Sequence, residues 1–163
     1  MPGGHEPRLM QQLRLLLQQQ RVAMLATCTP DGLPHASMVP FAVEPTQGLL
    51  VLHVSQLAAH TRYMQQQPAV SLLIVQPEQA EEPVHALPRV SLDGEAHTPE
   101  RTTDAWQQAR AAYLARFPEV EPMLALEDFR FVTISPKQAR HIAGFGAARN
   151  VDLDELAGIL QSK

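Results

Sequence analysis

Residues 22–28 follow a period of two, and a short turn sequence separates them from a second strand-length segment over 34–43. The turn reads Thr29-Pro30-Asp31-Gly32, in which proline and glycine favour the backbone angles of a tight reversal. Such alternation is typical of strands that bury one face. The sequence therefore predicts a β-hairpin near the N-terminus, and two strands joined by so short a connection must run antiparallel.

Further strand patterns follow along the chain. They cover residues 49–54, 69–75, 89–97 and 128–135. The run 49–54 is apolar throughout, which predicts burial on both faces. Pro40 cannot donate to a sheet ladder, so the strand over 34–43 should be bulged or lie at an edge there. Five or six short strands joined mostly by hairpins favour a small antiparallel barrel over a doubly wound parallel sheet.

Helices are predicted around these strands. Apolar spacings of three and four indicate a helix over 6–20, and a short helix should follow Ser55 and end before Pro68. Thr98-Pro99-Glu100 is typical of a helix start, and that helix should run to Phe117. We expect one domain over 1–163, made of an N-terminal helix (1–20), a barrel with inserted helices (21–151) and a C-terminal helix (152–163) that begins at Asp152.

Composition narrows the class of protein. The chain has 163 residues, of which 45% are hydrophobic and 18% charged, as in a globular domain. Its net charge of −4 gives no positive field to attract nucleic acid, so a nucleic-acid partner is not expected. The leucine run 15–17 is flanked by glutamines and is too short for a signal peptide or a membrane span. With Cys28 as the single thiol, we expect a cytoplasmic protein without a membrane association.

The usual catalytic motifs are missing from the sequence. It has no glycine-rich phosphate loop, HExxH pair, cysteine pair or nucleophile elbow, and its seven histidines lack metal-ligand spacing. We therefore expect no bound metal. Catalysis, if present, should depend on a bound cofactor rather than on a set of side chains.

The segment from Ser55 to Arg62 has the outline of an anion site. A serine between a buried strand and a helix leaves backbone N–H groups free, and Thr61 and Arg62 follow one to two turns later. The alternative is an ordinary capped helix with a solvated Arg62. Arg89, at the start of a strand, could point toward the same rim as Ser55, or it could pair with the acidic loop over 77–88.

Seven segments occur together, in this order, between residues 21 and 151. They are Leu25-Ala26-Thr27, Pro30-Asp31-Gly32-Leu33-Pro34, Ala36-Ser37-Met38-Val39-Pro40-Phe41, Ser55-Gln56-Leu57-Ala58-Ala59-His60-Thr61-Arg62, Pro68-Ala69-Val70-Ser71-Leu72, Arg89-Val90-Ser91-Leu92-Asp93-Gly94 and Ala143-Gly144-Phe145-Gly146-Ala147. Their combination resembles the pyridoxamine 5′-phosphate oxidase-like family of FMN-binding split barrels, and within it the haem-utilisation (HugZ-type) branch.

The resemblance implies a mainly β, α+β fold: a six-stranded antiparallel split β-barrel with peripheral helices, in a homodimer that holds FMN at the subunit interface. The implied flavin contacts are Ala36, Ser37, Met38 and Val39, the implied phosphate contacts are Ser55, His60, Thr61 and Arg62, and Arg89 is implied to approach the flavin. His60 stands where the oxidases proper have a lysine, which predicts a modest affinity for FMN.

Two functions follow from this resemblance. The first is an FMN-dependent oxidoreductase acting on a small molecule, with haem utilisation or degradation as the activity of the similar branch. The second is a non-catalytic, dimeric haem- or ligand-binding protein that binds FMN weakly or has lost it. His141, before the Gly144-Phe145-Gly146 turn, could act as an axial ligand or a proton donor, or could simply end a strand.

Overall fold

The computed structural model describes residues 6–162, in which four α-helices pack around one eight-stranded sheet. The strands are β1 (Val22–Cys28), β2 (Pro34–Pro40), β3 (Ala42–Glu44), β4 (Leu49–Ser55), β5 (Ala69–Val75), β6 (Arg89–His97), β7 (Phe129–Ile142) and β8 (Ala148–Val151). The helices are α1 (Arg8–Gln19), α2 (Ala59–Gln66), α3 (Asp104–Arg116) and α4 (Leu153–Leu160), with short 3-10 helices η1 (Val84–Ala86) and η2 (Pro118–Ala125).

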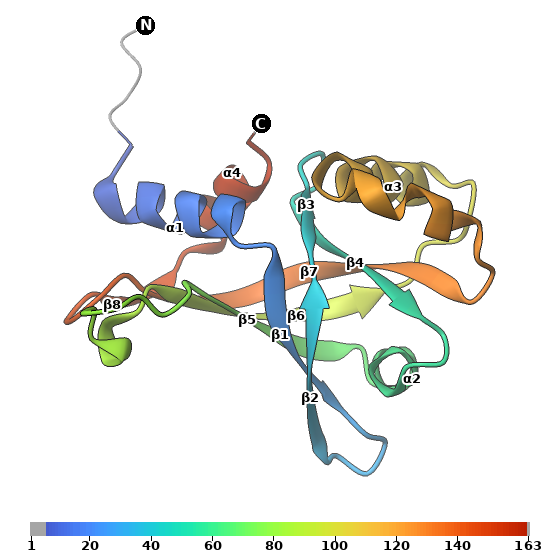
Figure 1. The fold of residues 1–163 in the computed structure, drawn as a ribbon, viewed down its shortest axis with the longest axis horizontal. Helices are drawn as coiled ribbons and strands as arrows, with labels where there is room; N and C mark the ends of the chain where they lie inside the picture. Colours follow the sequence, from blue (N-terminus) through green and yellow to red (C-terminus); the bar gives the residue numbers. More distant parts are fainter. Residues whose placement is uncertain (1–5, 163) are drawn as a thin grey trace, which may run out of the picture.

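The strands follow the order β2-β1-β5-β6-β7-β4-β3, with β8 paired to β7, and neighbours are antiparallel throughout. β7 joins the two halves of the sheet, because its first half pairs with β4 and its second half with β8. Figure 1 shows the sheet curling, with α1 and α4 side by side over one part and α3 over another. The predicted antiparallel split-barrel class is confirmed.

A β-bulge bends the central strands. The register between β6 and β7 shifts between Asp93 and Gly94, so that Gly94 lies opposite Pro136 and Lys137 has no partner. A Cβ at Gly94 would come within 2.7 Å of the Ile134 side chain and of the Ser135 carbonyl oxygen. Glycine therefore permits the close approach of the two backbones at this bend.

Buried side chains form two layers on opposite faces of β4. Leu50 and Leu52 belong to the main core, which α1 and α4 cover. Val51 belongs to a second cluster beneath α3, together with Tyr113 and Phe131. Because alternate residues of a strand face opposite ways, the continuous apolar run of β4 serves both layers. The predicted burial on both faces is confirmed for Leu50, Val51 and Leu52.

Several element predictions need correction. The sheet has eight strands rather than six, because the strand expected over 34–43 breaks after Pro40 into β2 and β3, and β8 was not predicted. The strand expected over 128–135 continues through Pro136 to Ile142. The helix expected from Thr98 begins at Asp104, where the Thr103 hydroxyl accepts from the Trp106 N–H at 3.2 Å. The predicted Asp152 cap is confirmed, since its carboxylate accepts from the Asp154 N–H at 2.7 Å.

Candidate functional site

Strand β2 and helix α2 meet through one polar contact between two predicted site residues. The Ser37 Oγ lies 3.1 Å from Nδ1 of His60. One turn further along α2, the ring of Tyr63 contacts His35 edge to face, with ring centroids 5.3 Å apart. The resemblance assigns Ser37 to the flavin and His60 to the phosphate, and the tertiary fold brings the two side chains into contact.

The residues of β2 divide between its two faces and its free edge. Ala36 and Met38 are exposed on one face, whereas Ser37 is half-buried and Val39 buried on the other. Among residues 6–162, β2 pairs only with β1, so alternate backbone N–H and C=O groups over 36–39 remain unpaired along its outer edge. The backbone groups along this edge can donate hydrogen bonds to a planar ligand and accept hydrogen bonds from it, without the help of a side chain.

Ser55 and Thr61 hold the turn that leads into α2. The Thr61 hydroxyl, which is buried, donates to the Ser55 carbonyl oxygen at 2.6 Å. The Ser55 hydroxyl accepts from the Leu57 N–H at 3.1 Å. Ser55 does not cap α2, since the helix begins at Ala59 after Ala58 and has no capping side chain. In this structure both hydroxyls stabilise the turn, and the alternative of an ordinary capped helix is wrong, since no side chain caps α2.

Arg62 supplies the positive charge of this region. Its side chain is exposed and makes one long contact, 3.4 Å, to the Leu57 carbonyl oxygen. No carboxylate within the described residues 6–162 forms an ion pair with it. Burial lowers the pKa of His60 below its ordinary value of 6.5, and the neighbouring His35 lowers this pKa further. His60 is therefore neutral at pH 7, and Arg62, two residues further along α2, carries a permanent charge.

Arg89 lies at the other end of the sheet from Ser55. Ser55 pairs with Phe129 at the start of β7, whereas Arg89 pairs with Ile142 at its end. Those positions are separated by roughly 40 Å of strand at about 3.3 Å per residue. The Arg89 guanidinium donates to the Leu87 carbonyl oxygen at 2.9 Å. The expectation that Arg89 points toward the same rim as Ser55 is wrong within one chain.

A cleft of about 750 Å³ lies between residues of β1, β2, β5, β6 and β7 and the end of α2. It is lined by Ala26, Thr27, Cys28, Pro34, Gln67, Pro68, Ala69, Val70, Ser71, Asp93, Gly94, Glu95 and Lys137. None of the nine predicted ligand residues lines it. Sequence reasoning missed this cleft because the strand register assembles it, although Asp93-Gly94 within a strand pattern is a sequence signal for a bulge.

An apolar row crosses the exposed face of the sheet next to this cleft. Met24 of β1 pairs with Met38 of β2 on one side and with Leu73 of β5 on the other. These three side chains are 42%, 56% and 38% exposed. Large apolar side chains gathered on one surface are typical of protein or ligand contacts. We call this surface the methionine face.

His141 is inaccessible to any ligand. Its side chain is completely buried, between Val90 of β6 and Arg149 of β8. The following turn has positive φ angles at Gly144 (144°) and Gly146 (70°), and Phe145 is 73% exposed at its tip. As folded here, His141 cannot be an axial ligand or a proton donor to a bound molecule.

No helix within 6–162 is long and apolar enough to cross a membrane. Over the same residues, no group of three or more histidine, cysteine, aspartate or glutamate side chains is placed to hold a metal ion.

Comparison with known proteins identifies the family. The family model described as pyridoxamine 5′-phosphate oxidase matches residues 9–143. The chain is 31% identical over 150 residues to heme oxygenase HutZ of Vibrio cholerae, covering 91% of this chain and 84% of that protein. It is 32% identical over 140 residues to the chloroplastic heme oxygenase HOZ of Arabidopsis thaliana, covering 85% of this chain but only 41% of that protein.

The fold agrees with these matches. The solved structure of a heme binding protein from Mycobacterium smegmatis superimposes with a TM-score of 0.83 at 30% identity, covering 94% of this chain and 62% of that one. The chain thus spans less than two thirds of the mycobacterial and plant relatives. It belongs to the pyridoxamine 5′-phosphate oxidase-like split-barrel family, in the HugZ-type branch of that family.

Proposed function

We propose that this protein binds haem and acts on it as a redox substrate, and that it works as a homodimer. One observation carries the proposal: the chain matches most of the length of a relative named as a heme oxygenase, at 31% identity. A second relative, which matches 85% of the chain, is named as a non-canonical heme oxygenase. Those two names describe the relatives, and we extend haem chemistry from them to this chain.

The anionic groups of the ligand would lie beside β2 and α2. Arg62 offers an exposed guanidinium without a carboxylate partner among residues 6–162. A carboxylate or a phosphate can accept two parallel N–H bonds from such a group. The free edge of β2 over 36–39 would contact the planar part of the ligand. Haem propionates and the FMN phosphate both have this anionic chemistry.

A second copy of the chain would complete the site. Ser55 of β4 and Arg89 of β6 pair with opposite ends of β7, so both can contact one ligand only if they come from different subunits. The methionine face supports such pairing, because Met24, Met38 and Leu73 would leave water when two copies meet. The proposed site therefore contains Arg62 of one subunit and Arg89 of its partner.

FMN is the second candidate ligand, favoured by the same geometry. The residues fit it: unpaired backbone groups of β2 match the alternating donors and acceptors of a flavin edge, and Arg62 can bind the phosphate. When bound, FMN would supply electron transfer that no side chain here provides. Neutral His60 beside Ser37 adds no permanent charge, so FMN binding should be weaker than in a site that has a lysine there.

Spectroscopic titration separates the two candidates. Purified protein is titrated in separate experiments with hemin and with FMN, and the absorption spectrum is followed. Saturable hemin binding near one per chain, with a shifted Soret band, supports the haem proposal. Saturable FMN binding without hemin binding makes the protein a flavoprotein instead, and the absence of both refutes the assigned site.

Arg62→Ala should weaken binding of the anionic ligand about tenfold, because it removes one charge-assisted contact at a partly exposed site. The titration above measures this change. Arg8→Ala is the matched control, since Arg8 is an exposed arginine on α1, far from α2 in Figure 1. Equal affinities for the two variants would remove Arg62 from the site.

A further inference from the structure

Helix α4 is joined to the sheet by one ion pair. The Arg149 guanidinium on β8 donates two parallel bonds to the Glu155 carboxylate on α4, at 2.9 and 2.8 Å. Both side chains are about three quarters buried, with 23% and 22% exposure. A bidentate pair in this setting is a strong and directional contact. It fixes the first turn of α4 against the β7–β8 hairpin.

Next to this pair lie polar atoms that have no partner. His141 is the register neighbour of Arg149 and is completely buried. Among residues 6–162, neither ring nitrogen of His141 finds a hydrogen-bond partner, and the same holds for Nε of Arg149. A buried neutral imidazole without partners costs some stability, but a buried imidazolium without an acceptor costs much more. The structure therefore depends on His141 staying neutral.

Charges near His141 come from two elements. Arg149 on β8 lowers the pKa of His141 in addition to the larger effect of burial, and Glu155 on α4 opposes this. The opposite residue on β6 is the apolar Val90. The other charged groups near α4 do not act on His141. Arg14 of α1 forms an ion pair with Glu6 at 2.6 Å. Asp152 accepts a hydrogen bond from the Asp154 N–H, and both aspartates are exposed to solvent.

We propose that His141, Arg149 and Glu155 form a proton-sensitive latch, which holds α4 on the sheet at neutral pH and releases it in acid. A proton on His141 places a second cation beside Arg149, and the single nearby carboxylate cannot pair well with both. Splitting the ion pair and opening α4 admits water to the imidazolium. Opening would expose Leu156, Ile159 and Leu160, which α4 buries in the core.

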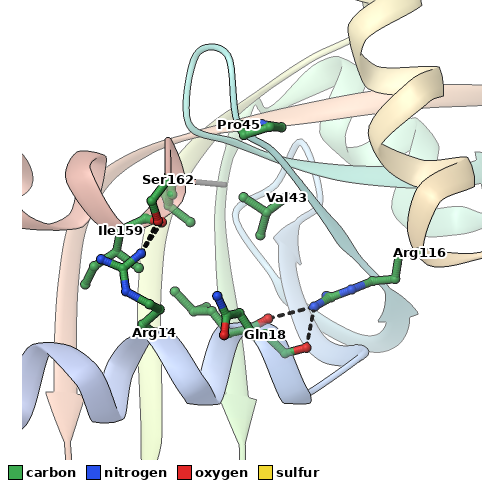
Figure 2. Close-up of a pocket in the computed structure, with 9 residues that line it drawn as sticks. Arg14, Gln18, Val43, Pro45, Arg116, Ile159 and Ser162 are labelled. Carbon is green, nitrogen blue, oxygen red and sulfur yellow. Dashed lines mark hydrogen bonds between the residues drawn. The ribbon is translucent and has the colours of Figure 1, made fainter.

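Figure 2 shows what lies under the other end of α4. Ile159 and Ser162 form one wall of a small pocket of about 150 Å³, with Val43 and Arg116 across from them. Arg14 reaches Ser162 and the Ile159 carbonyl oxygen from α1. Release of α4 would remove that wall and open the pocket to solvent.

The direction of the pH effect follows from linkage. The folded protein has a lowered pKa at His141, so the unfolded or opened state takes up the proton first as the pH falls below the ordinary value of 6.5. The stabilisation is fully present above that pH and is lost below it. One proton changes the opening equilibrium by at most about tenfold per pH unit.

Hydrogen exchange of the intact chain tests the latch. Protection factors, corrected for intrinsic exchange, are compared at pH 7.5 and 5.5 for peptides from α4 and, as an internal reference, from β5. We expect α4 protection to fall several-fold, up to about tenfold, in acid while β5 changes little. In His141→Phe the α4 protection should be equal at the two pH values, because nothing titrates there.

Two further variants keep the test decisive. His141→Met replaces His141→Phe as the non-titrating variant if phenylalanine does not fit the site. His97→Gln changes an exposed histidine and is the control, so its α4 protection should depend on pH as in the unmodified protein. The proposal is overturned if α4 protection does not change with pH, if the His141 variants keep the acid effect, or if α4 and β5 lose protection together, since the last result means global unfolding.

Discussion

Arg116→Met should lower the free energy of unfolding by about 3 kcal/mol, because it leaves several partly buried carbonyl groups without a donor. The Arg116 guanidinium donates to the carbonyl oxygens of Leu17 (2.9 Å), Gln18 (2.8 Å) and Gln20 (3.1 Å) at the end of α1. It also donates to the Phe41 carbonyl oxygen at 3.0 Å. Figure 2 shows Arg116 reaching across to the end of α1.

The effect is large because Arg116 binds the carbonyl groups at the C-terminal end of α1. The last carbonyl groups of a helix have no partner within it, and a cation there also interacts favourably with the helix dipole. Arg116 meets both needs for α1 and ties α3 to the segment between β2 and β3. Methionine keeps much of the apolar stem but offers no donor.

Urea denaturation measures this prediction, with Arg21→Met as the matched control. Arg21 also lies near α3, but its side chain is 55% exposed and its pairing with Glu119 is long, at 3.5 Å. Its replacement should cost less than about 1 kcal/mol. If the two variants unfold at the same urea concentration, Arg116 does not stabilise the end of α1 as described.

Met24→Glu should convert the proposed dimer into monomers, raising the dissociation constant at least about 100-fold, equivalent to about 2.7 kcal/mol. Met24 is the central residue of the methionine face, between Met38 and Leu73. A carboxylate there would lose its water on dimerisation without an opposite charge to pair with. The chain should still fold, because Met24 is 42% exposed in the single subunit.

Sedimentation velocity over a range of concentrations gives the oligomeric state. Leu15→Glu is the control, since Leu15 is 48% exposed on α1 rather than on the methionine face, and this variant should remain dimeric. Ligand affinity should fall together with dimerisation in Met24→Glu. An unmodified protein that is monomeric at every concentration would refute the shared site.

Local signals predicted much of the fold. The bounds of β1, β5 and β6 agree with the sequence prediction, because each is a strand-length segment bounded by turn residues. The strand predicted over 128–135 ended too early, because proline is unfavourable inside a strand and Pro136 follows. The structure accommodates Pro136 opposite the bulge at Gly94, where the regular ladder is already interrupted. That tertiary pairing has no signal in the local sequence.

The candidate site was predictable only in part, because much of it depends on tertiary contacts. The resemblance assigned Ser37 to the flavin and His60 to the phosphate of one site, and the fold brings the two side chains to 3.1 Å. The position of Arg89 depends on the register of β6 with β7, which the sequence does not encode in any local pattern. The hydroxyl of Thr61 looked available, but the turn before α2 uses it.

A mixed-dimer titration with hemin tests the shared site most directly. Arg62→Glu and Arg89→Glu chains are each purified, shown to have lost tight hemin binding, then mixed in equal amounts and allowed to exchange subunits. Random exchange of a two-fold dimer gives half mixed dimers with one intact site each, so about a quarter of all sites should regain tight binding. If the mixture binds no more hemin than its separate components, Arg62 and Arg89 do not meet across two subunits, and the proposed haem site is wrong.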